Sequence, residues 1–292
     1  MAARLEGQPV VDFVIVPLWR RAGFAEACLR RLALAMDGGV RVLLSVDCGH
    51  DEETLDVARE FAAKQPGRAQ LAVRDVDYPS GSYNVFTAMR EALGWVGPDD
   101  VIHVLEEDIL IGRGYFGFHR SAHRITPGAY SVSACENIFL PDETRVQQRE
   151  NSVYLSGAFQ VWGSSYRPDR VEKILKRLRP EYFADMGKAM AAEFGEANML
   201  RTGALYDGVM ANDLAQQGMH VTFPFVPRAY HAGFEGLSYG DMALTGPAGE
   251  QAEAILGMSG DELKARCTLP GARFRPIDLD WNPGAVTEVR AF

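Results

Sequence analysis

Short apolar runs alternate with amphipathic segments through the first 110 or so residues. The runs at 10–18, 40–46, 69–73 and 101–105 read VVDFVIVPL, VRVLLSV, AQLAV and VIHVL. Consecutive apolar positions rich in β-branched residues are typical of strands that are buried on both faces of a parallel sheet. The intervening segments place apolar residues at helical spacing and predict helices within 19–39, 51–64 and 85–94. Strand and helix alternate four times, so we predict an α/β fold with a right-handed, doubly wound, mostly parallel sheet flanked by helices.

The second half of the chain has a less regular pattern. It predicts strands at 129–134, 152–162 and 221–226, and helices at 115–125, 168–179, 186–200 and 208–217. Four glycines within 229–241 predict a mobile loop whose backbone N–H groups can approach a ligand closely. No internal repeat or linker interrupts the chain, so we expect one domain over residues 1–292, with halves at about 1–110 and 111–245 and a tail at 246–292.

Composition narrows the class of protein. Hydrophobic residues make up 47% and charged residues 24%, which is typical of a globular domain that can bury a full core. No apolar run approaches the roughly 20 residues of a membrane span, and the N-terminus lacks the pattern of a signal peptide, so we expect a cytoplasmic protein. The four cysteines are scattered and predict neither a zinc site nor a disulfide framework. No G-x-G-x-x-G follows the first strand, which argues against a dinucleotide-dependent dehydrogenase.

Three consecutive acids, Glu106, Glu107 and Asp108, follow the predicted strand at 101–105. Carboxylates at the carboxyl end of such a strand lie in the crevice where open α/β sheets bind ligands. Adjacent carboxylates repel one another, so a cation or hydrogen bonds should offset the repulsion. Oxygen ligands favour Mg²⁺ or Mn²⁺ shared with a substrate diphosphate. A solvated acidic turn is the alternative, and these residues alone do not separate the two.

An ordered set of short motifs resembles the family of N-acetylglucosaminyltransferase I, whose members are inverting, metal-dependent transferases of the nucleotide-sugar (GT-A) fold. The resemblance runs from about residue 12 to 242 with similar gaps. Its matching segments are Asp47-Cys48-Gly49-His50 with Glu52-Glu53-Thr54, the acids Glu106-Glu107-Asp108, the pair Tyr206-Asp207, the run PFVPRAYHAG at 224–233, and Gly236-Leu237-Ser238.

The resemblance implies a role for each matched position. It implies a Mn²⁺ or Mg²⁺ ion on Asp108, with His231 as a candidate additional ligand, and Asp207 as the general base that deprotonates the acceptor hydroxyl. The residues it implies for binding the nucleotide and donor sugar are Arg20, Arg21, Asp47, Val85, Glu106 and Glu107, with Leu237 and Ser238 closing over the diphosphate. The local pattern favours a helix N-cap for Asp207 and a turn residue for Asp47, and only the resemblance reverses that order.

The expected reaction is transfer of a hexose or N-acetylhexosamine from a nucleotide-diphosphate donor, with a UDP-sugar favoured, to a hydroxyl acceptor. Three aromatic residues, Tyr154, Phe159 and Trp162, are candidates to face an acceptor sugar ring. The basic helix predicted at 168–179 would instead suit a polyanion such as hydroxymethylated DNA, but the net charge of −9 favours a saccharide and admits nucleic acid only as an acceptor. A nucleotidyltransferase and a non-catalytic nucleotide-sugar binding module are the alternatives from other classes.

Overall fold

The structure, a computed structural model, describes residues 10–76, 81–135, 151–178 and 206–232, together with 280, 282 and 284–290. The helices within these ranges are α1 (Ala22–Ala35), α2 (Glu52–Lys64), α3 (Gly81–Leu93), α4 (Tyr115–Ile125), α5 (Pro168–Arg177) and α8 (Tyr206–Gln217). The strands are β1 (Asp12–Leu18), β2 (Val40–Val46), β3 (Ala69–Val73), β4 (Val101–Val104), β5 (Ile109–Ile111), β6 (Ser131–Ser133), β7 (Ser152–Ser156), β8 (Ser164–Tyr166), β9 (Val221–Pro224), β10 (Ala229–His231) and β11 (Glu288–Val289).

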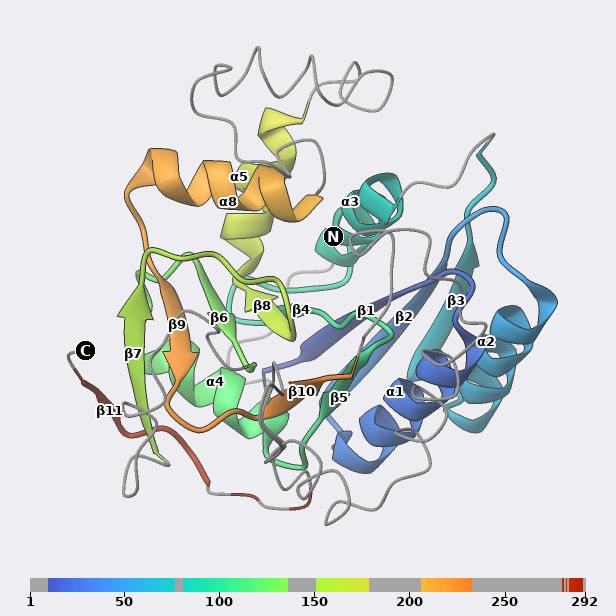
Figure 1. Ribbon diagram of the computed structural model, residues 1–292, viewed down its shortest axis with the longest axis horizontal. Coiled ribbons are helices and arrows are strands. Elements are labelled where there is room, and N and C mark those ends of the chain that lie inside the picture. Colours follow the sequence, from blue (N-terminus) through green and yellow to red (C-terminus); the bar gives the residue numbers. More distant parts are fainter. Residues whose placement is uncertain are drawn as a thin grey trace, which may run out of the picture.

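One large sheet organises the fold, in the strand order β11-β7-β9-β6-β8-β4-β1-β2-β3 (Figure 1). β4, β1, β2 and β3 are parallel, so the predicted α/β class and the parallel sheet of the first part of the chain are confirmed. β8 joins the sheet antiparallel to both β4 and β6. β1 therefore lies between β2 and β4, and the strand order reverses beside it. Ligands bind at such a switch point in open α/β sheets.

Each face of the sheet carries its own hydrophobic core. Val14, Val16 and Leu18 of β1 point to the core shared with α1, α2 and α4, whereas Phe13 and Ile15 point to the core shared with α3, α5 and α8. Figure 1 shows α1 and α2 on one side of the sheet and α3, α5 and α8 on the other. Because successive strand residues face opposite sides, β1 is apolar from Phe13 to Leu18, where it lies between these two layers.

The second half departs from prediction in two places. The strand predicted at 152–162 ends at Ser156, and a separate strand, β8, follows at 164–166. Gly163 makes the turn between them with φ +58°, a backbone conformation that is energetically unfavourable for any residue with a Cβ. The predicted loop at 229–241 begins instead as strand β10, which pairs antiparallel with β5. Pairing with β5 satisfies the backbone polar groups of this buried segment.

Helix α3 begins earlier than the sequence predicted, at Gly81 rather than near Val85. The polar residues in its first turn, Ser82 and Asn84, are buried instead of lying in a loop. Asn84 reaches the backbone of β2, where its Nδ2 donates to the carbonyl oxygen of Ser45 at 2.7 Å. A tertiary hydrogen bond therefore extends the helix beyond its apolar segment.

A buried polar cluster joins β1, β4 and α4 inside the first of these cores. His103 Nε2 lies 2.9 Å from Asp12 Oδ1, and both side chains are fully buried. His119 and His123 share one hydroxyl, with ring nitrogens 2.6 Å and 2.8 Å from Ser165 Oγ. Burial lowers the pKa of both α4 imidazoles well below the usual range, so they are neutral in the folded protein at neutral pH.

Candidate functional site

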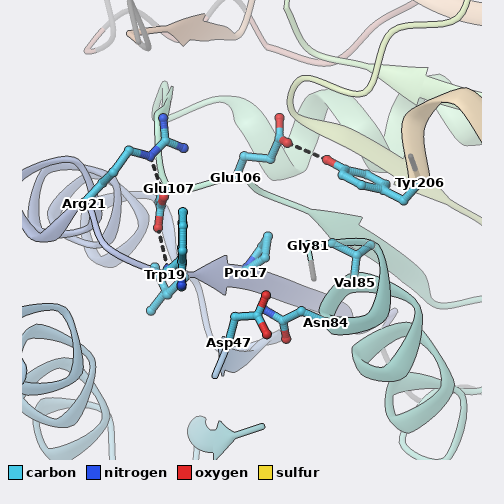
Figure 2. A pocket seen from close by; sticks show the side chains of 11 residues that line it. Pro17, Trp19, Arg21, Asp47, Gly81, Asn84, Val85, Glu106, Glu107 and Tyr206 are labelled. Carbon is cyan, nitrogen blue, oxygen red and sulfur yellow. Dashed lines mark hydrogen bonds and ion pairs between the residues drawn. The ribbon is translucent and has the colours of Figure 1, made fainter. Parts of the chain in front are cut away.

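A pocket of about 440 Å³ opens at the carboxyl ends of β1, β2 and β4. Its lining residues are Pro17, Leu18, Trp19, Arg21, Asp47, Gly81, Asn84, Val85, Glu106, Glu107 and Tyr206 (Figure 2). Parallel strands present their carboxyl ends to one edge of the sheet, which brings together residues far apart in sequence. The structure thus gathers five of the predicted donor-side residues, namely Arg21, Asp47, Val85, Glu106 and Glu107, around one cavity.

Glu107 binds the turn between β1 and α1. Its Oε1 accepts from Arg21 Nε at 2.6 Å, and its Oε2 accepts from the Trp19 backbone N–H at 3.1 Å. Burial raises the pKa of Glu107, and the Arg21 charge acts in the opposite direction. Both oxygens therefore fix the turn that forms one wall of the pocket. Trp19 is a lining residue that the sequence reading missed, because nothing in its local pattern marked it.

Asp108 immediately precedes strand β5 and is almost completely buried. Its Oδ2 accepts from Arg21 Nη1 at 2.8 Å, and His231 Nε2 lies 3.8 Å from the same oxygen. Its other oxygen, Oδ1, is buried and has no hydrogen-bond partner among the residues that the structure describes. A buried carboxylate oxygen is costly to leave unsatisfied, so this atom is suited to accept a ligand that the protein alone does not supply.

His231 reaches Asp108 through the pairing of β10 with β5. The register places His231 opposite Ile109, and the Ala232 N–H donates to the Asp108 carbonyl oxygen at 2.8 Å. The indole of Trp162 stacks on the imidazole with ring centroids 4.4 Å apart and planes inclined by 26°. The family resemblance had implied His231 as an additional ligand beside Asp108, although more than 120 residues separate the two, whereas the stacking of Trp162 on His231 was not predicted.

The donor set around Asp108 fits a hard divalent cation that also binds substrate. Asp108 Oδ1 has no partner within the described ranges, and the imidazole of His231 lies 3.8 Å from the other oxygen of the same carboxylate. Oxygen and nitrogen ligands suit Mn²⁺ or Mg²⁺. Within the described ranges, no cluster of three or more His, Cys, Asp or Glu side chains is placed to hold a metal ion. A cation here would therefore take most of its ligands from substrate and water.

Glu106 points across the pocket toward helix α8. Tyr206 donates its hydroxyl to Glu106 Oε1 at 2.5 Å, and Figure 2 shows the two side chains facing one another. Burial, reinforced by the charge of Asp108, raises the pKa of Glu106 to about 8. Glu106 therefore differs from Glu107, which has a guanidinium as its partner.

Asp207 lies in the first turn of α8, one residue after its start, rather than before the helix as predicted. Its Oδ1 accepts from the next backbone N–H, that of Gly208, at 2.8 Å. Burial raises its pKa, with hydrogen bonds to backbone N–H groups acting in the opposite direction. Asp207 thus makes a hydrogen bond typical of an aspartate at the start of a helix, as the local sequence favoured. The preceding residue, Tyr206, lines the pocket.

Asp47 follows β2 and is buried in the wall of the pocket. Its Oδ1 accepts from the Cys48 N–H at 2.9 Å, which is the turn contact that the local sequence favoured. Beside it the floor contains a polar network that the sequence did not reveal. Arg74 donates to Ser45 Oγ at 2.9 Å and to Asn84 Oδ1 at 3.1 Å, so the amide of Asn84 is held in one orientation.

The other predicted nucleotide contacts separate into two groups. Val85 contributes a buried apolar wall from α3. Arg20 is exposed and outside the set of lining residues, because its Nε donates to the Gly49 carbonyl at 2.5 Å and its guanidinium lies over the Trp19 ring. Leu237, Ser238 and the rest of the predicted diphosphate-covering loop from 233 to 241 lie outside the described residues, as does the helix predicted at 186–200.

The three aromatic candidates for acceptor binding have different environments. Tyr154 is 1% exposed and stacks on Phe223 in the core, so its ring has no free surface for an acceptor, and the structure argues against this prediction. Phe159 is half-buried and packs edge-on against Tyr130 at 6.2 Å. Trp162 is half-buried, and one of its faces is occupied by His231.

Basic helix α5 is largely neutralised by neighbouring acids. Lys173 pairs with Asp169 at 3.1 Å and Lys176 with Glu172 at 2.7 Å. Arg177 forms an ion pair with Asp213 of α8. Charges paired in this way form a solvated face or hold two helices together, so α5 gives no support to a polyanionic acceptor.

No helix in the described part of the chain combines the length and the apolar character needed to cross a bilayer. No protein-family model matches the sequence, and comparison with curated proteins finds no match. Solved structures of similar shape include the mannosyltransferase PcManGT from Pyrobaculum calidifontis in complex with GDP-Man and Mn²⁺, at 15% identity and a TM-score of 0.47, with 92% of this chain and 81% of that chain covered. Residues 1–349 of TarS from S. aureus are 12% identical at a TM-score of 0.43, with 74% of this chain and 60% of that chain covered. At these values the similarity leaves the function to be argued from the site.

Proposed function

We propose that this protein is a metal-dependent, inverting glycosyltransferase of the GT-A fold that moves a sugar from a nucleotide-diphosphate donor, a UDP-sugar by preference, to a saccharide hydroxyl. The observation that carries the proposal is the buried Asp108 oxygen, which has no partner among the described residues. Its side chain lies beside His231 and is paired with Arg21, which lines the pocket at the sheet switch point. The motif resemblance to the N-acetylglucosaminyltransferase I family supplies the reaction class.

Asp108 and His231 are the residues that would hold Mn²⁺ or Mg²⁺. When bound, such a cation neutralises charge on the donor diphosphate and on the nucleotide as it leaves. Arg21 already contacts Asp108 and Glu107, and it places a permanent positive charge at the same edge of the pocket. The guanidinium can therefore contribute to phosphate binding from the β1–α1 turn.

The remainder of the pocket suits a nucleoside. Val85 offers an apolar surface, and Asp47 offers a buried carboxylate to hydrogen-bond donors of a base or ribose. Glu106 lies between this region and α8, where the donor sugar would reach the acceptor side.

Asp207 is the proposed general base. The acceptor oxygen forms a bond to the anomeric carbon while the bond from that carbon to the diphosphate oxygen breaks. The electron pair of the broken bond leaves with the nucleoside diphosphate, and the acceptor proton passes to Asp207. A base whose pKa is raised by burial holds a proton more readily than an exposed aspartate, which suits this role.

The first experiment is a screen of UDP-, GDP-, dTDP- and CMP-sugars for release of free nucleotide in Mn²⁺, with a chelator as the matched blank. Metal-dependent release from one donor supports the transferase and excludes a pure binding module. Calorimetric binding of a sugar nucleotide without any release would favour the binding module. Incorporation of a nucleotide from a triphosphate, with release of pyrophosphate, would favour the nucleotidyltransferase.

Asp207→Asn tests the base. The amide keeps the shape and can still accept from Gly208, but it cannot take a proton, so kcat should fall about 10²- to 10⁴-fold at unchanged donor affinity. Asp169→Asn makes the same change in the first turn of α5 and is the matched control. Transfer by Asp207→Asn within a few-fold of the wild-type rate would assign Asp207 to the helix start alone.

A further inference from the structure

Tyr206 makes the contact that joins the acidic strand end to the helix bearing Asp207. Ten of the described residues that line the pocket come from positions 17 to 107, and Tyr206 is the lining residue from the second half of the chain. Its hydroxyl donates to Glu106 Oε1 at 2.5 Å. Its ring packs edge-on against Phe86 of α3, with centroids 6.4 Å apart and planes inclined by 87°. The side chain is therefore fixed at both its ring and its hydroxyl.

Within the part of the chain that the structure describes, the other polar contacts of α8 with neighbouring elements lie farther along the helix. Met210 accepts from the Tyr166 hydroxyl at 3.2 Å, Asp213 pairs with Arg177, and Gln217 accepts from Arg170 at 2.5 Å. These contacts hold the middle and the end of α8 against β8 and α5. Removing the Tyr206 hydroxyl should therefore release the first turn and leave the rest of the helix in place.

We propose that Tyr206 is a positioning residue, which through its hydrogen bond to Glu106 fixes the first turn of α8 and so sets the place of Asp207 relative to the donor. This inference rests on the proposed function. The sequence pair Tyr206-Asp207 places the two side chains on adjacent residues, so any shift of the first turn moves both. A base misplaced by about 1 Å costs a large part of its contribution to the rate, because proton transfer needs hydrogen-bond distance to the acceptor hydroxyl.

The decisive variant is Tyr206→Phe, which keeps the ring and its packing on Phe86 and removes one oxygen. The matched control is Tyr166→Phe, which also removes a buried tyrosine hydroxyl that touches α8 but lies outside the pocket lining. We expect kcat of Tyr206→Phe to fall about tenfold or more, because a hydrogen bond to a carboxylate is lost, while the Kd for nucleotide and Mn²⁺ stays within about twofold. The control should retain kcat within about twofold.

Amide hydrogen exchange gives a second readout that needs no turnover. In Tyr206→Phe the amides of residues 210 and 211, which close the first helical turn, should exchange about tenfold faster, and those of residues 213 to 216 should not change. Tyr166→Phe should leave the amides of the first turn unchanged. Slower turnover combined with faster exchange confined to the first turn supports positioning.

The outcomes separate this inference from the proposed function. Wild-type protein that neither binds nor cleaves any sugar nucleotide overturns both the function and the inference built on it. Active wild-type protein with full kcat in Tyr206→Phe keeps the function and overturns the positioning role. A loss of donor affinity equal to the loss of kcat makes Tyr206 a donor-binding residue instead, and unchanged exchange in the first turn also overturns the inference.

Discussion

Arg21 is the positive charge that stabilises two buried carboxylates, and replacing it with Met provides a direct measure of that arrangement. The guanidinium lies 2.6 Å from Glu107 Oε1 and 2.8 Å from Asp108 Oδ2, and the arginine side chain is only 22% exposed. Removing one partner of a buried ion pair typically costs about 3–5 kcal/mol. Because Arg21 retains some contact with water, we expect Arg21→Met to lower the free energy of unfolding by about 3 kcal/mol at pH 7.

The loss should depend on pH in a defined direction. Burial already raises the pKa of Glu107 in the folded protein, and the Arg21 charge opposes that shift. Without the guanidinium the pKa of Glu107 rises further, so the folded variant binds a proton more readily than the unfolded chain. The difference in stability between wild type and variant is then full above this raised pKa and decreases as the pH falls toward about 4. Urea unfolding at pH 7 and pH 5, followed by circular dichroism, measures this difference.

Metal should partly replace the lost charge. If Asp108 binds Mn²⁺, the ion should stabilise Arg21→Met more than wild type, because the variant has no competing guanidinium on Asp108. Arg59→Met is the matched control, since Arg59 also contacts two acids, at 2.6 Å and 3.0 Å, but is 52% exposed. The control should unfold at nearly the wild-type urea concentration. An Arg21 variant as stable as the Arg59 variant at pH 7 would refute the reasoning.

Three further predictions follow from single features of the fold. Trp162→Leu removes the ring stacked on His231 and should weaken Mn²⁺ binding in the presence of nucleotide by about tenfold, and an unchanged calorimetric Kd would refute the supporting role. His119 and His123 are buried neutral, so stability should be full above about pH 6.5 and fall below it, approaching about 1.4 kcal/mol per pH unit for each imidazole, and urea midpoints equal at pH 7 and 5.5 would contradict this. Gly163→Ala places a Cβ at φ +58° and should lower the unfolding free energy by about 1–2 kcal/mol in the same urea assay, which a wild-type midpoint would exclude.

The sequence was sufficient wherever one local pattern had one structural solution. β2 and β3 begin and end where the apolar runs predicted. For β2 the reason is that a run of apolar residues between turn signals is buried between two layers, whereas β3 lies at the edge of the sheet and is only partly buried. The acids at 106–108 could likewise be placed at a ligand-binding edge, since the direction of a parallel strand fixes where its carboxyl end lies. The role of Asp207 stays a prediction: the local sequence favours a residue that caps the helix, and the family resemblance implies a general base.

What the sequence could not supply were contacts made by residues distant along the chain. The sequence predicted β10 as part of a glycine-rich loop. Its backbone is extended because it pairs with β5, a partner more than 100 residues away that the local sequence does not indicate. Tyr154 is of a residue type that can stack on a sugar ring, and only its packing against Phe223 shows that it belongs to the hydrophobic core.

The amino-acid sequence by itself determined the α/β class, the alternation of strands and helices along the first part of the chain, and the place of the acids 106–108 at the carboxyl end of a strand. These features follow from the period of the hydrophobic residues and from the direction of the strands. Tertiary structure alone decided which side chains meet there. The pairing of Arg21 with Asp108 and the hydrogen bond from Tyr206 to Glu106 each join residues at least 87 positions apart. Such contacts depend on how the sheet and its two helical layers pack as a whole, and no local periodicity encodes them.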